Sequence, residues 1–600
     1  MLVSGILFTA SLFAVGGWER RWIADDGLTV LRTVRNLLAG NGPVFNVGER
    51  VEVNTSTAWT YLLWFLGWLT QARLEYVALG IALILSVGAV VFAMAGTARL
   101  WEGSGARLLL PAGAIVYIAV PPARDYATSG LESSLVICWL AVLWWLLIHW
   151  GRSETVRPTT LFVLSFVAGL APLIRPEMSL VGAPALLMLC CAPHPGRRQW
   201  VHRVLIVVSA GCVPVAYQIW RMGYYGLPYP NTAVAKDAGG AKWHQGFVYL
   251  WNLVGPYWLW VPLMALGIAA TVMWPRNSAT TCGTKPTLRE RLHELRSWLR
   301  SPAAVVALML GSGILLTIYE TRVGGDFMHG RMLLPPLFCL LLPVMVLPLK
   351  TVAVPVVSKI PQLILPATFA VTIGWALCAA DVTAIDSSNK ITPTGIADER
   401  LYYIQTTGHE HPIRAEDYLD YPRIRAMISE IARNPNGGLL INSPTWTWQV
   451  VPPPTTGPDG AAGHTVYFMN LGMIGMNTPL SVRVVDPMGL AYPLAAHTFR
   501  FPDARIGHDK NLDTDWAVVD AGMAAQHPLL PLFIDEGWVA RIRTALSCPG
   551  TRDLLAATRA PLTADLFLRN ISRSLEYATY RIDRVPEHEI ARCGVGETPS

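Results

Sequence analysis

The chain has few charged residues for its length. Of its 600 residues, 15% are Asp, Glu, Lys or Arg and 52% are hydrophobic, whereas a soluble protein averages about 25% charged residues. The apolar residues also cluster in long runs, for example over 76–96, 133–150 and 204–220. Runs of this length can cross the hydrocarbon core of a bilayer. The sequence therefore predicts a protein that crosses a membrane several times.

Other absences narrow the class further. The nine cysteines form no CxxC pair, and no group of residues has metal-ligand spacing; the nearest, His409-Glu410-His411, fits a solvated loop. Segment 2–18 has no basic residues before it and no small-residue cleavage site after it. It therefore predicts a membrane helix rather than a signal peptide. The net charge of +6 does not indicate a nucleic-acid partner, because basic residues gather beside membrane helices.

Charge distribution predicts which loops face the cytoplasm. Five loops are richer in Lys and Arg than the loops that alternate with them, and basic loops stay inside; they are 97–107, 151–158, 193–203, 275–301 and 349–360. The first outer loop runs against this rule, because it contains Arg20, Arg21, Arg32, Arg35 and Arg50.

Parity then limits the number of crossings. Segments 56–70 and 76–97 both lie between the first outer loop and the inner loop 97–107. An outer loop and an inner loop are joined by an odd number of membrane crossings, so only one of the two segments can span. Segment 56–70 is the shorter and is rich in Trp and Tyr, residues favoured at membrane interfaces. We interpret it as an interfacial helix on the outer face. Of twelve apolar segments, the last near 362–380, about eleven are then predicted to span.

The region after residue 380 differs in composition from the membrane region before it. Charges return, and turn residues separate short apolar runs that predict strands, at 438–442, 446–451, 481–485 and 516–519. The predicted fold is thus a polytopic α-helical membrane domain over 1–380 and a soluble mixed α/β domain over 381–600 on the outer face. Cys548 and Cys593 are the only cysteines of that outer domain. We expect them to pair, because an exported compartment can be oxidising.

The outer loops contain the candidate chemistry, because ionisable residues beside membrane helices are costly and mark functional sites by default. Asp25 and Asp26 suit a general base that activates a hydroxyl, although they also fit a helix N-terminus. Basic side chains suit a phosphate, although each also fits an interface anchor or a solvated residue; the candidates are Arg175, Lys236, His329 and Arg331.

Further outer residues are candidate substrate contacts. Glu132, Glu177, Asn231 and Asp326 lie in the same loops as the basic candidates, and the two glutamates also fit helix N-terminal charges. In the outer domain, Trp446 and Trp448 lie two residues apart, so on a strand they would share one face. Such a face suits a sugar ring, but a domain core is the simpler interpretation.

The ordered set of outer motifs resembles the GT-C superfamily of glycosyltransferases. It comprises the acidic pair, Ser129-Gly130-Leu131-Glu132, Arg175-Pro176-Glu177, Tyr224-Tyr225-Gly226 with Pro230-Asn231-Thr232 and Lys236, and Gly324-Gly325-Asp326 before His329 and Arg331. Segments 24–59 and 482–492 look, more narrowly, like the mycobacterial terminal arabinofuranosyltransferases of the AftB type.

The resemblance implies a specific reaction in cell-wall biogenesis. The donor would be decaprenyl-phosphoryl arabinofuranose, and the acceptor would be the arabinan ends of arabinogalactan and lipoarabinomannan, joined by a β-(1→2) linkage. The enzyme would lie in the plasma membrane with its site and outer domain facing the periplasm. We expect no cofactor and no essential metal, because basic side chains can neutralise one monophosphate. By the superfamily pattern the catalytic acid is Asp25, as a base, a nucleophile or a stabiliser of positive charge.

Two alternatives stay open on the sequence alone. A transporter or flippase for a polyprenyl-linked sugar would share the membrane helices and the phosphate-binding charges, but would need no large outer domain. The second alternative is an enzyme of the same superfamily, a GT-C transferase for mannose or aminoarabinose. The expected partners in each case are a lipid-linked sugar and membrane lipid, with no nucleic acid.

Overall fold

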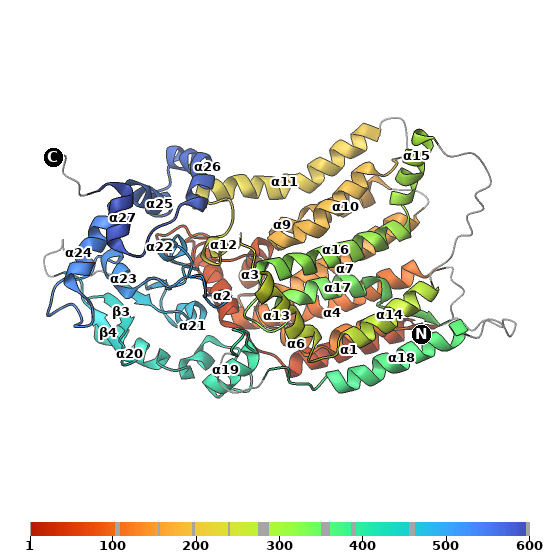
Figure 1. The fold of residues 1–600 in the computed structure, drawn as a ribbon, viewed down its shortest axis with the longest axis horizontal. Helices are drawn as coiled ribbons and strands as arrows, with labels where there is room; N and C mark the ends of the chain where they lie inside the picture. Colours follow the sequence, from red (N-terminus) through yellow and green to blue (C-terminus); the bar gives the residue numbers. More distant parts are fainter. Residues whose placement is uncertain are drawn as a thin grey trace. The chain divides into compact units, whose positions relative to one another are not determined.

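The computed structural model is mainly helical (Figure 1). It describes residues 2–102, 108–153, 157–194, 199–237, 240–273, 287–349, 360–385, 392–454 and 463–595. Two compact units interleave along the chain. Unit 1 comprises Met1–Arg21, Leu79–Val215 and Ala241–Asp398, and unit 2 comprises Trp22–Ala78, Ala216–Gly240 and Glu399–Ser600. The first outer loop of the sequence thus belongs to the same unit as the C-terminal region.

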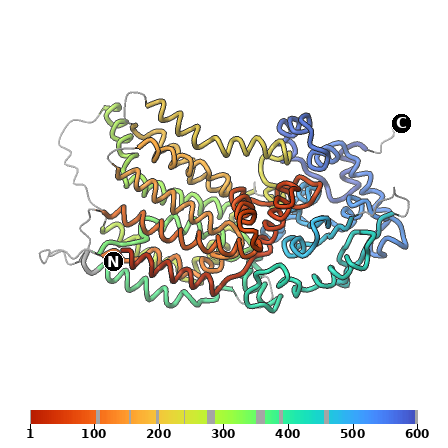
Figure 2. The backbone as a smooth tube through the Cα atoms, turned by 180° about the vertical axis from the view of Figure 1, so that it is seen from behind, coloured from red at the N-terminus to blue at the C-terminus, as the bar shows by residue number. Residues whose placement is uncertain are grey.

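Apolar helices that run side by side form unit 1 (Figures 1 and 2). Among the described residues, five helices are long and apolar enough to cross a membrane: α1 (Leu2–Glu19), α4 (Leu74–Leu100), α7 (Ser133–Arg152), α11 (Gln199–Tyr225) and α16 (Pro302–Val323). Shorter apolar helices are α8 (Pro158–Gly169), α10 (Ser179–Cys191), α14 (Trp260–Met273), α17 (Leu334–Leu341) and α18 (Ile360–Ala379). The chain is a membrane protein, and the count of eleven spans stays a prediction.

One of the twelve apolar segments of the sequence, 108–120, is predicted to be a membrane helix and has a different structure. Residues 108–120 form strand β1 (Leu108–Leu110) and the helix α5 (Ala112–Ala119) instead of one continuous helix. Strand β1 pairs in antiparallel register with β2 (Leu347–Leu349). Pro111 separates the strand from the helix, because proline has no N–H for a helix interior and is tolerated at a helix start. The prediction of a single helix over 108–120 is therefore wrong.

Unit 2 gathers three separate stretches of the chain. The first contributes α2 (Asp25–Leu38) and α3 (Thr57–Thr70), and the second contributes the end of α11 and the short helix α12 (Asn231–Ala235). The third, from α19 (Glu399–Thr407) to α27 (Pro586–Cys593), mixes helices and strands as the sequence predicts. Its other helices are η5 (Ala415–Asp420), α20 (Ile424–Arg433), α21 (Leu471–Asn477), α22 (Pro493–Ala496), α23 (Thr514–Asp520), α24 (Glu536–Ala545), α25 (Pro549–Arg559) and α26 (Ala564–Thr579).

A four-stranded sheet lies within the third stretch. Its order is β4-β3-β5-β6, with β3 (Gly438–Asn442) antiparallel to β4 (Trp448–Val451) and parallel to β5 (His464–Tyr467), which is parallel to β6 (Arg483–Val485). Three of the four predicted strands are confirmed. The fourth is wrong, because 516–519 lies in α23, where Trp516, Ala517 and Val518 are all buried. A short helix buried on several sides gives the same continuous apolar run as a strand.

The expected pairing of Cys548 and Cys593 is confirmed. Cys548, which precedes α25, forms a disulfide with Cys593, the last residue of α27. The two residues are 45 positions apart. The bond therefore closes a loop that contains α25, α26 and most of α27, and it ties the C-terminal helix of unit 2 to the rest of that unit.

Candidate functional site

The predicted catalytic acid begins helix α2 in unit 2. Asp25 is the first residue of α2, and its side chain is buried, with 7% of the residue exposed. One carboxylate oxygen, Oδ1, accepts the backbone N–H of Met473 at 2.7 Å. Met473 lies in α21, and the neighbouring Gly472 is needed there. A Cβ at that position would come within 1.8 Å of the Asp25 carbonyl oxygen.

Burial without a counter-ion sets the protonation of Asp25. Among the described residues no basic side chain forms an ion pair with it. Burial raises the pKa of Asp25 from 3.8 to about 7; the Met473 N–H opposes this shift, and the nearby charge of Asp26 adds to it. Near neutral pH the carboxyl group is thus divided between its two forms, as a proton-transfer group requires.

Tyrosines from the C-terminal region surround the head of α2. Tyr418 donates a hydrogen bond from its hydroxyl to the backbone oxygen of Ile23, two residues before Asp25. Its ring centroid is 5.4 Å from that of Tyr403, which also lies 6.2 Å from Tyr421. The charge of Asp25 contributes, after burial, to raising the pKa of all three phenols. Sequence reasoning missed these three tyrosines, because no local motif around them indicates that they lie near Asp25.

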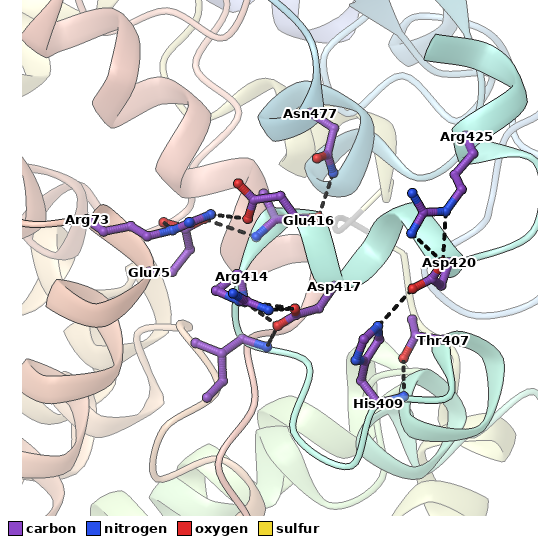
Figure 3. A network of polar contacts seen from close by, with 12 residues as sticks. Arg73, Glu75, Thr407, His409, Arg414, Glu416, Asp417, Asp420, Arg425 and Asn477 are labelled. Carbon is purple, nitrogen blue, oxygen red and sulfur yellow. Dashed lines mark hydrogen bonds and ion pairs between the residues drawn. The ribbon is translucent and has the colours of Figure 1, made fainter. Parts of the chain in front are cut away.

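A polar network fixes the segment that carries Tyr418 (Figure 3). Glu75 accepts the backbone N–H of Ala415 at 3.0 Å, and the Asn477 amide donates to the Ala415 carbonyl at 2.6 Å. Arg73 forms ion pairs with both Glu75 and Glu416. The start of η5 is therefore anchored from α4 and from α21, the helix that also contacts Asp25. Such outer contacts hold a functional group in a fixed geometry.

Two of the five arginines that run against the charge rule, Arg32 and Arg50, donate to backbone carbonyls inside unit 2. Arg32 is fully buried and donates to the backbone oxygens of Phe45, Gly475 and Val482 at 3.0, 2.5 and 2.6 Å. Arg50 donates to the carbonyls of Ala557 and Ala560 at 3.0 and 2.7 Å. These guanidiniums satisfy backbone acceptors within unit 2. The fold thus gives these two arginines a structural use, in a loop where the charge rule would not place them.

Two other predicted residues of unit 2 lie on and beside α12. Asn231 is buried, and its side-chain amide donates to the carbonyls of Gly489 and Leu490 at 2.7 and 3.0 Å. Its observed contacts thus hold the 489–490 backbone. Lys236 follows α12 and is half-buried, with its backbone N–H bonded to Thr232 at 3.0 Å.

The two tryptophans do not share a strand face. Trp446 lies in the turn before β4, with φ of 63°, and is 67% exposed, whereas Trp448 is the first residue of β4. The prediction of a common strand face is wrong, because the strand begins two residues later than expected. Both tryptophans nevertheless contact Arg423. Its guanidinium lies 4.1 Å from the Trp446 ring centroid, and its carbonyl accepts the Trp448 indole N–H at 2.8 Å.

Five of the predicted residues meet in unit 1. One carboxylate oxygen of Glu132, Oε1, forms ion pairs with the guanidiniums of Arg175 at 2.7 Å and Arg331 at 3.2 Å. Arg175 also pairs with Glu177 at 2.5 Å, and Arg331 with Asp326 at 3.3 Å. We call these residues the arginine–carboxylate cluster. The sequence placed them in three different loops, and the fold brings them into one chain of ion pairs.

The arginine–carboxylate cluster contains more acids than bases. Burial alone would raise the pKa of Glu132, but the charges of Arg175 and Arg331 outweigh it and hold that pKa below its usual 4.5. Glu132 is therefore ionised at neutral pH. Both arginines are already matched by carboxylates, so a phosphate that binds here must compete with those carboxylates.

His329 differs from its neighbours in charge. Its Nε2 lies 2.8 Å from the Tyr257 hydroxyl, and its Nδ1 lies 2.5 Å from Asn252 Oδ1. Burial lowers its pKa to about 4, so the imidazole is neutral near pH 7. The expectation that His329 supplies a positive charge is therefore wrong. A neutral imidazole donates one hydrogen bond and accepts one, and here both ring nitrogens have protein neighbours.

Comparison with known proteins places the chain in a family. The model of the AftB family C-terminal domain matches residues 433–590. A terminal β-(1→2)-arabinofuranosyltransferase of Mycobacterium tuberculosis is 50% identical over 613 aligned positions, covering 98% of this chain and 96% of the relative. The chain belongs to the AftB family. A terminal β-(1→2)-arabinofuranosyltransferase of Corynebacterium glutamicum is 38% identical to this chain, covering 94% of this chain and 84% of the relative.

Membership of the AftB family confirms the predicted family and makes the chain a glycosyltransferase, which sets aside the transporter alternative. Solved structures are less similar. ArnT from Cupriavidus metallidurans bound to undecaprenyl phosphate has a TM-score of 0.41 and 12% identity, covering 80% of this chain and 89% of that one. A mycobacterial arabinofuranosyltransferase, AftD, has a TM-score of 0.35 and 13% identity, covering 74% and 31%. Such scores do not establish a shared fold.

Proposed function

We propose that this AftB-family protein transfers arabinofuranose from a decaprenyl-phosphate carrier to the ends of arabinan chains in arabinogalactan and lipoarabinomannan, forming a β-(1→2) linkage. The named activity of the two relatives supports this reaction. The donor lipid and the acceptor polymers follow from the motif resemblance of the outer loops. In this proposal the membrane domain is of the GT-C type, and no cofactor or metal is required.

One observation supports Asp25 as the acid that serves the chemistry. Its carboxyl group is buried without a cation, and its pKa is about 7. A base, a nucleophile and an electrostatic stabiliser all require an ionised carboxylate, and a pKa near the working pH keeps that form accessible. Asp25 therefore fits each of the three roles, and Asp26 acts through its charge on Asp25.

The first test is a product assay on the purified full-length protein. Synthetic polyprenyl-phosphate donors of arabinofuranose, mannose and aminoarabinose are offered with a defined oligoarabinofuranoside. We expect transfer from the arabinofuranose donor alone and a new β-(1→2) linkage by NMR. Transfer of mannose or aminoarabinose in its place would contradict the proposal. Activity that disappears in a chelator and returns with added metal would contradict the metal-free mechanism.

Within unit 1, the donor phosphate is proposed to bind the basic residues Arg175 and Arg331, with His329 contributing as a neutral donor or acceptor. Lys236 belongs to unit 2, and its contact with the phosphate stays a separate prediction. The charges of the arginine–carboxylate cluster suggest a direct test. Glu132→Gln removes one carboxylate that both arginines contact and keeps the size of the side chain. If the arginines hold the phosphate, the affinity for decaprenyl phosphate should rise severalfold in Glu132→Gln and fall in Arg175→Gln. Equal affinity in both variants and the parent would reject this phosphate site.

The proposed sidedness places Asp25 and the C-terminal region outside, with eleven spans and with α3 lying on the outer face. The burial pattern of α3 suits that location. Trp59 and Leu63 are fully buried, whereas Phe65, Trp68 and Leu69 are about half exposed. One side of α3 thus meets the protein, and the other presents aromatic and leucine side chains of the kind found at a bilayer interface.

Cysteine labelling tests this location. A cysteine at Gln71, the C-cap residue that follows α3, is treated with a membrane-impermeant thiol reagent on intact cells. Labelling from outside supports an interfacial α3. Labelling only after permeabilisation would mean that α3 spans the membrane, and the assignment of every later loop would be reversed. A second cysteine at Arg99, in the basic loop expected inside, serves as the matched control.

A further inference from the structure

Two residues in unit 2 adopt a backbone conformation that ordinary side chains avoid, and they contact each other. Arg423 has a φ of 75° and Trp446 a φ of 63°, in the left-handed region. The Arg423 guanidinium lies 4.1 Å from the centroid of the Trp446 ring. Left-handed residues other than Gly, Asn and Asp are uncommon. Their occurrence together is an outlier that calls for a function, because strained backbone is concentrated at functional sites.

The surroundings of Arg423 are aromatic rather than acidic. Its guanidinium is also 5.6 Å from the Phe468 ring, and the Phe468 ring is 5.3 Å from that of Trp448. No described carboxylate pairs with Arg423, and its buried Nη1 has no hydrogen-bond partner among the described residues. Trp446 is 67% exposed. We call Arg423, Trp446, Trp448 and Phe468 the aromatic platform.

Tyrosines connect the aromatic platform to the head of α2. Tyr421 lies two residues before Arg423, and its hydroxyl is 3.0 Å from the hydroxyl of Tyr402. Burial, Tyr402 and the charge of Asp25 raise the pKa of Tyr421, and the charge of Arg423 opposes that rise. Tyr421 therefore lies within electrostatic range of both Asp25 and Arg423. Tyr421 thus links Arg423 of the platform to the tyrosines near Asp25 within unit 2.

The chemistry of the platform fits a neutral, hydroxyl-rich ligand. An exposed indole offers a flat apolar face to the C–H side of a sugar ring. A guanidinium without a carboxylate partner offers N–H donors to hydroxyl oxygens, and its contact with the rings holds it in place. A protein partner would instead need a larger apolar patch.

Resting on the proposed function, we propose that the aromatic platform binds the acceptor glycan, with a furanose ring stacked on Trp446 and its hydroxyls bonded to Arg423. The platform would then hold the polymer at a distance from Asp25 and select acceptors long enough to reach both. Arg423 and Trp446 are binding residues in this proposal, and neither takes part in the chemical step. The prediction is thus an effect on the KM for acceptor and little effect on kcat.

The variants are chosen to avoid new backbone strain. Trp446→Asn and Arg423→Asn remove the ring and the guanidinium, while Asn tolerates positive φ better than most residues. Trp538 and Arg541 provide a matched control, because the Arg541 guanidinium lies 5.4 Å from the Trp538 ring within α24 of the same unit. Trp538→Ala and Arg541→Ala remove a contact of the same kind that the proposal does not use, although Arg541, unlike Arg423, also forms an ion pair with Glu587.

The measurements use the full-length protein in lipid nanodiscs. We expect the KM for an oligoarabinofuranoside to rise about tenfold in either platform variant, as for loss of binding shared by ground and transition states. The value of kcat, the KM for donor and the control variants should stay within about twofold. Saturation-transfer NMR with the oligosaccharide alone should lose its signal in Trp446→Asn and keep it in Trp538→Ala.

The outcomes separate this proposal from the proposed function. If the parent transfers arabinofuranose but the platform variants keep the parent's acceptor KM and NMR signal, the platform proposal is wrong and the function stands. If the donor KM rises instead, Arg423 binds the lipid phosphate, and the acceptor assignment is overturned. If no arabinofuranose is transferred but the NMR signal depends on Trp446, the platform binds glycan and the proposed reaction fails.

Discussion

Units 1 and 2 each bury a carboxylate at a candidate functional position, but they surround it differently. Glu132 in unit 1 is 3% exposed and contacts two guanidiniums, which hold its pKa below the usual value. Asp25 in unit 2 is 7% exposed and contacts a backbone N–H, and burial raises its pKa to about 7. Nearly equal burial thus gives opposite shifts, and the presence of a cation decides the direction.

The difference separates two uses of a buried acid. A carboxylate matched by arginines is ionised across the physiological range and fixes geometry. Structural ion pairs also shift pKa values, so the lowered pKa of such a carboxylate does not by itself indicate a role in chemistry. A carboxylate without a cation destabilises the fold when it ionises, and this cost is expected where proton transfer or charge stabilisation is needed. On this basis Asp25 is the stronger catalytic candidate, and Glu132 is a positioning group for Arg175 and Arg331.

The largest expected effect comes from removing the unmatched acid. Asp25→Asn keeps an oxygen that can accept the Met473 N–H but cannot ionise. We expect kcat for arabinofuranose transfer to fall by about 10²–10⁴-fold, the range for losing a proton-transfer group. The measurement is product formation from a synthetic donor by the full-length protein. Near-normal turnover in a well-folded Asp25→Asn protein would remove Asp25 from the catalytic role.

A second substitution tests the matched acid. Glu132→Gln leaves Arg175 with Glu177 and Arg331 with Asp326, but removes the oxygen that joins them. Breaking a buried pair costs about 3–5 kcal/mol when the partner is left unmatched, and the remaining partners should reduce that cost. We expect a clear fall in the melting temperature, measured by intrinsic fluorescence in detergent. An unchanged melting temperature would mean that the arginines do not depend on Glu132.

The pH dependence of stability should differ in sign between the two variants. Asp25 has a raised pKa, so its contribution to stability is present below 3.8 and is lost as the pH rises toward about 7. Asp25→Asn should therefore melt at a higher temperature than the parent above pH 7, and the difference should vanish near pH 4. Glu132 has a lowered pKa, so its contribution is present above 4.5 and is lost in acid. Parallel melting curves for the two variants from pH 4 to pH 8 would contradict the comparison.

Local sequence patterns predicted part of this picture. Long apolar runs predicted the membrane helices, and the acidic pair together with the ordered outer motifs predicted the family. The two lone cysteines of the outer domain predicted the disulfide between Cys548 and Cys593. Each of these signals lies in neighbouring residues or in residue counts, so the sequence displays it without the fold.

Contacts between distant residues were beyond the sequence. Asp25 and Met473 are separated by 448 positions, and the bond between them uses a backbone N–H that any residue could supply. Glu132 and Arg331 are 199 positions apart, so the sequence showed both charges but not their neutralisation. The charge of His329 was predicted wrongly for a related reason. Its pKa depends on burial, which the residue type does not reveal.

The smallest expected effect is that of Asp26→Asn, and it tests the electrostatics of the unmatched acid directly. Asp26 is more exposed than Asp25 and raises the pKa of Asp25 through its negative charge. Because every role considered for Asp25 needs an ionised carboxylate, kcat should fall as the pH drops through about 7. Removing the like charge at Asp26 should move this acid limb to lower pH.

The measurement is the pH profile of kcat for the parent and Asp26→Asn from pH 5 to pH 9. We expect turnover within about threefold of the parent above pH 8, where Asp25 is ionised in both proteins. Below pH 7 the variant should be the faster of the two, which distinguishes an electrostatic neighbour from a catalytic group. A loss of turnover at every pH, as severe as that of Asp25→Asn, would instead transfer the catalytic role to Asp26. An identical acid limb in both proteins would mean that the group titrating near pH 7 is not Asp25.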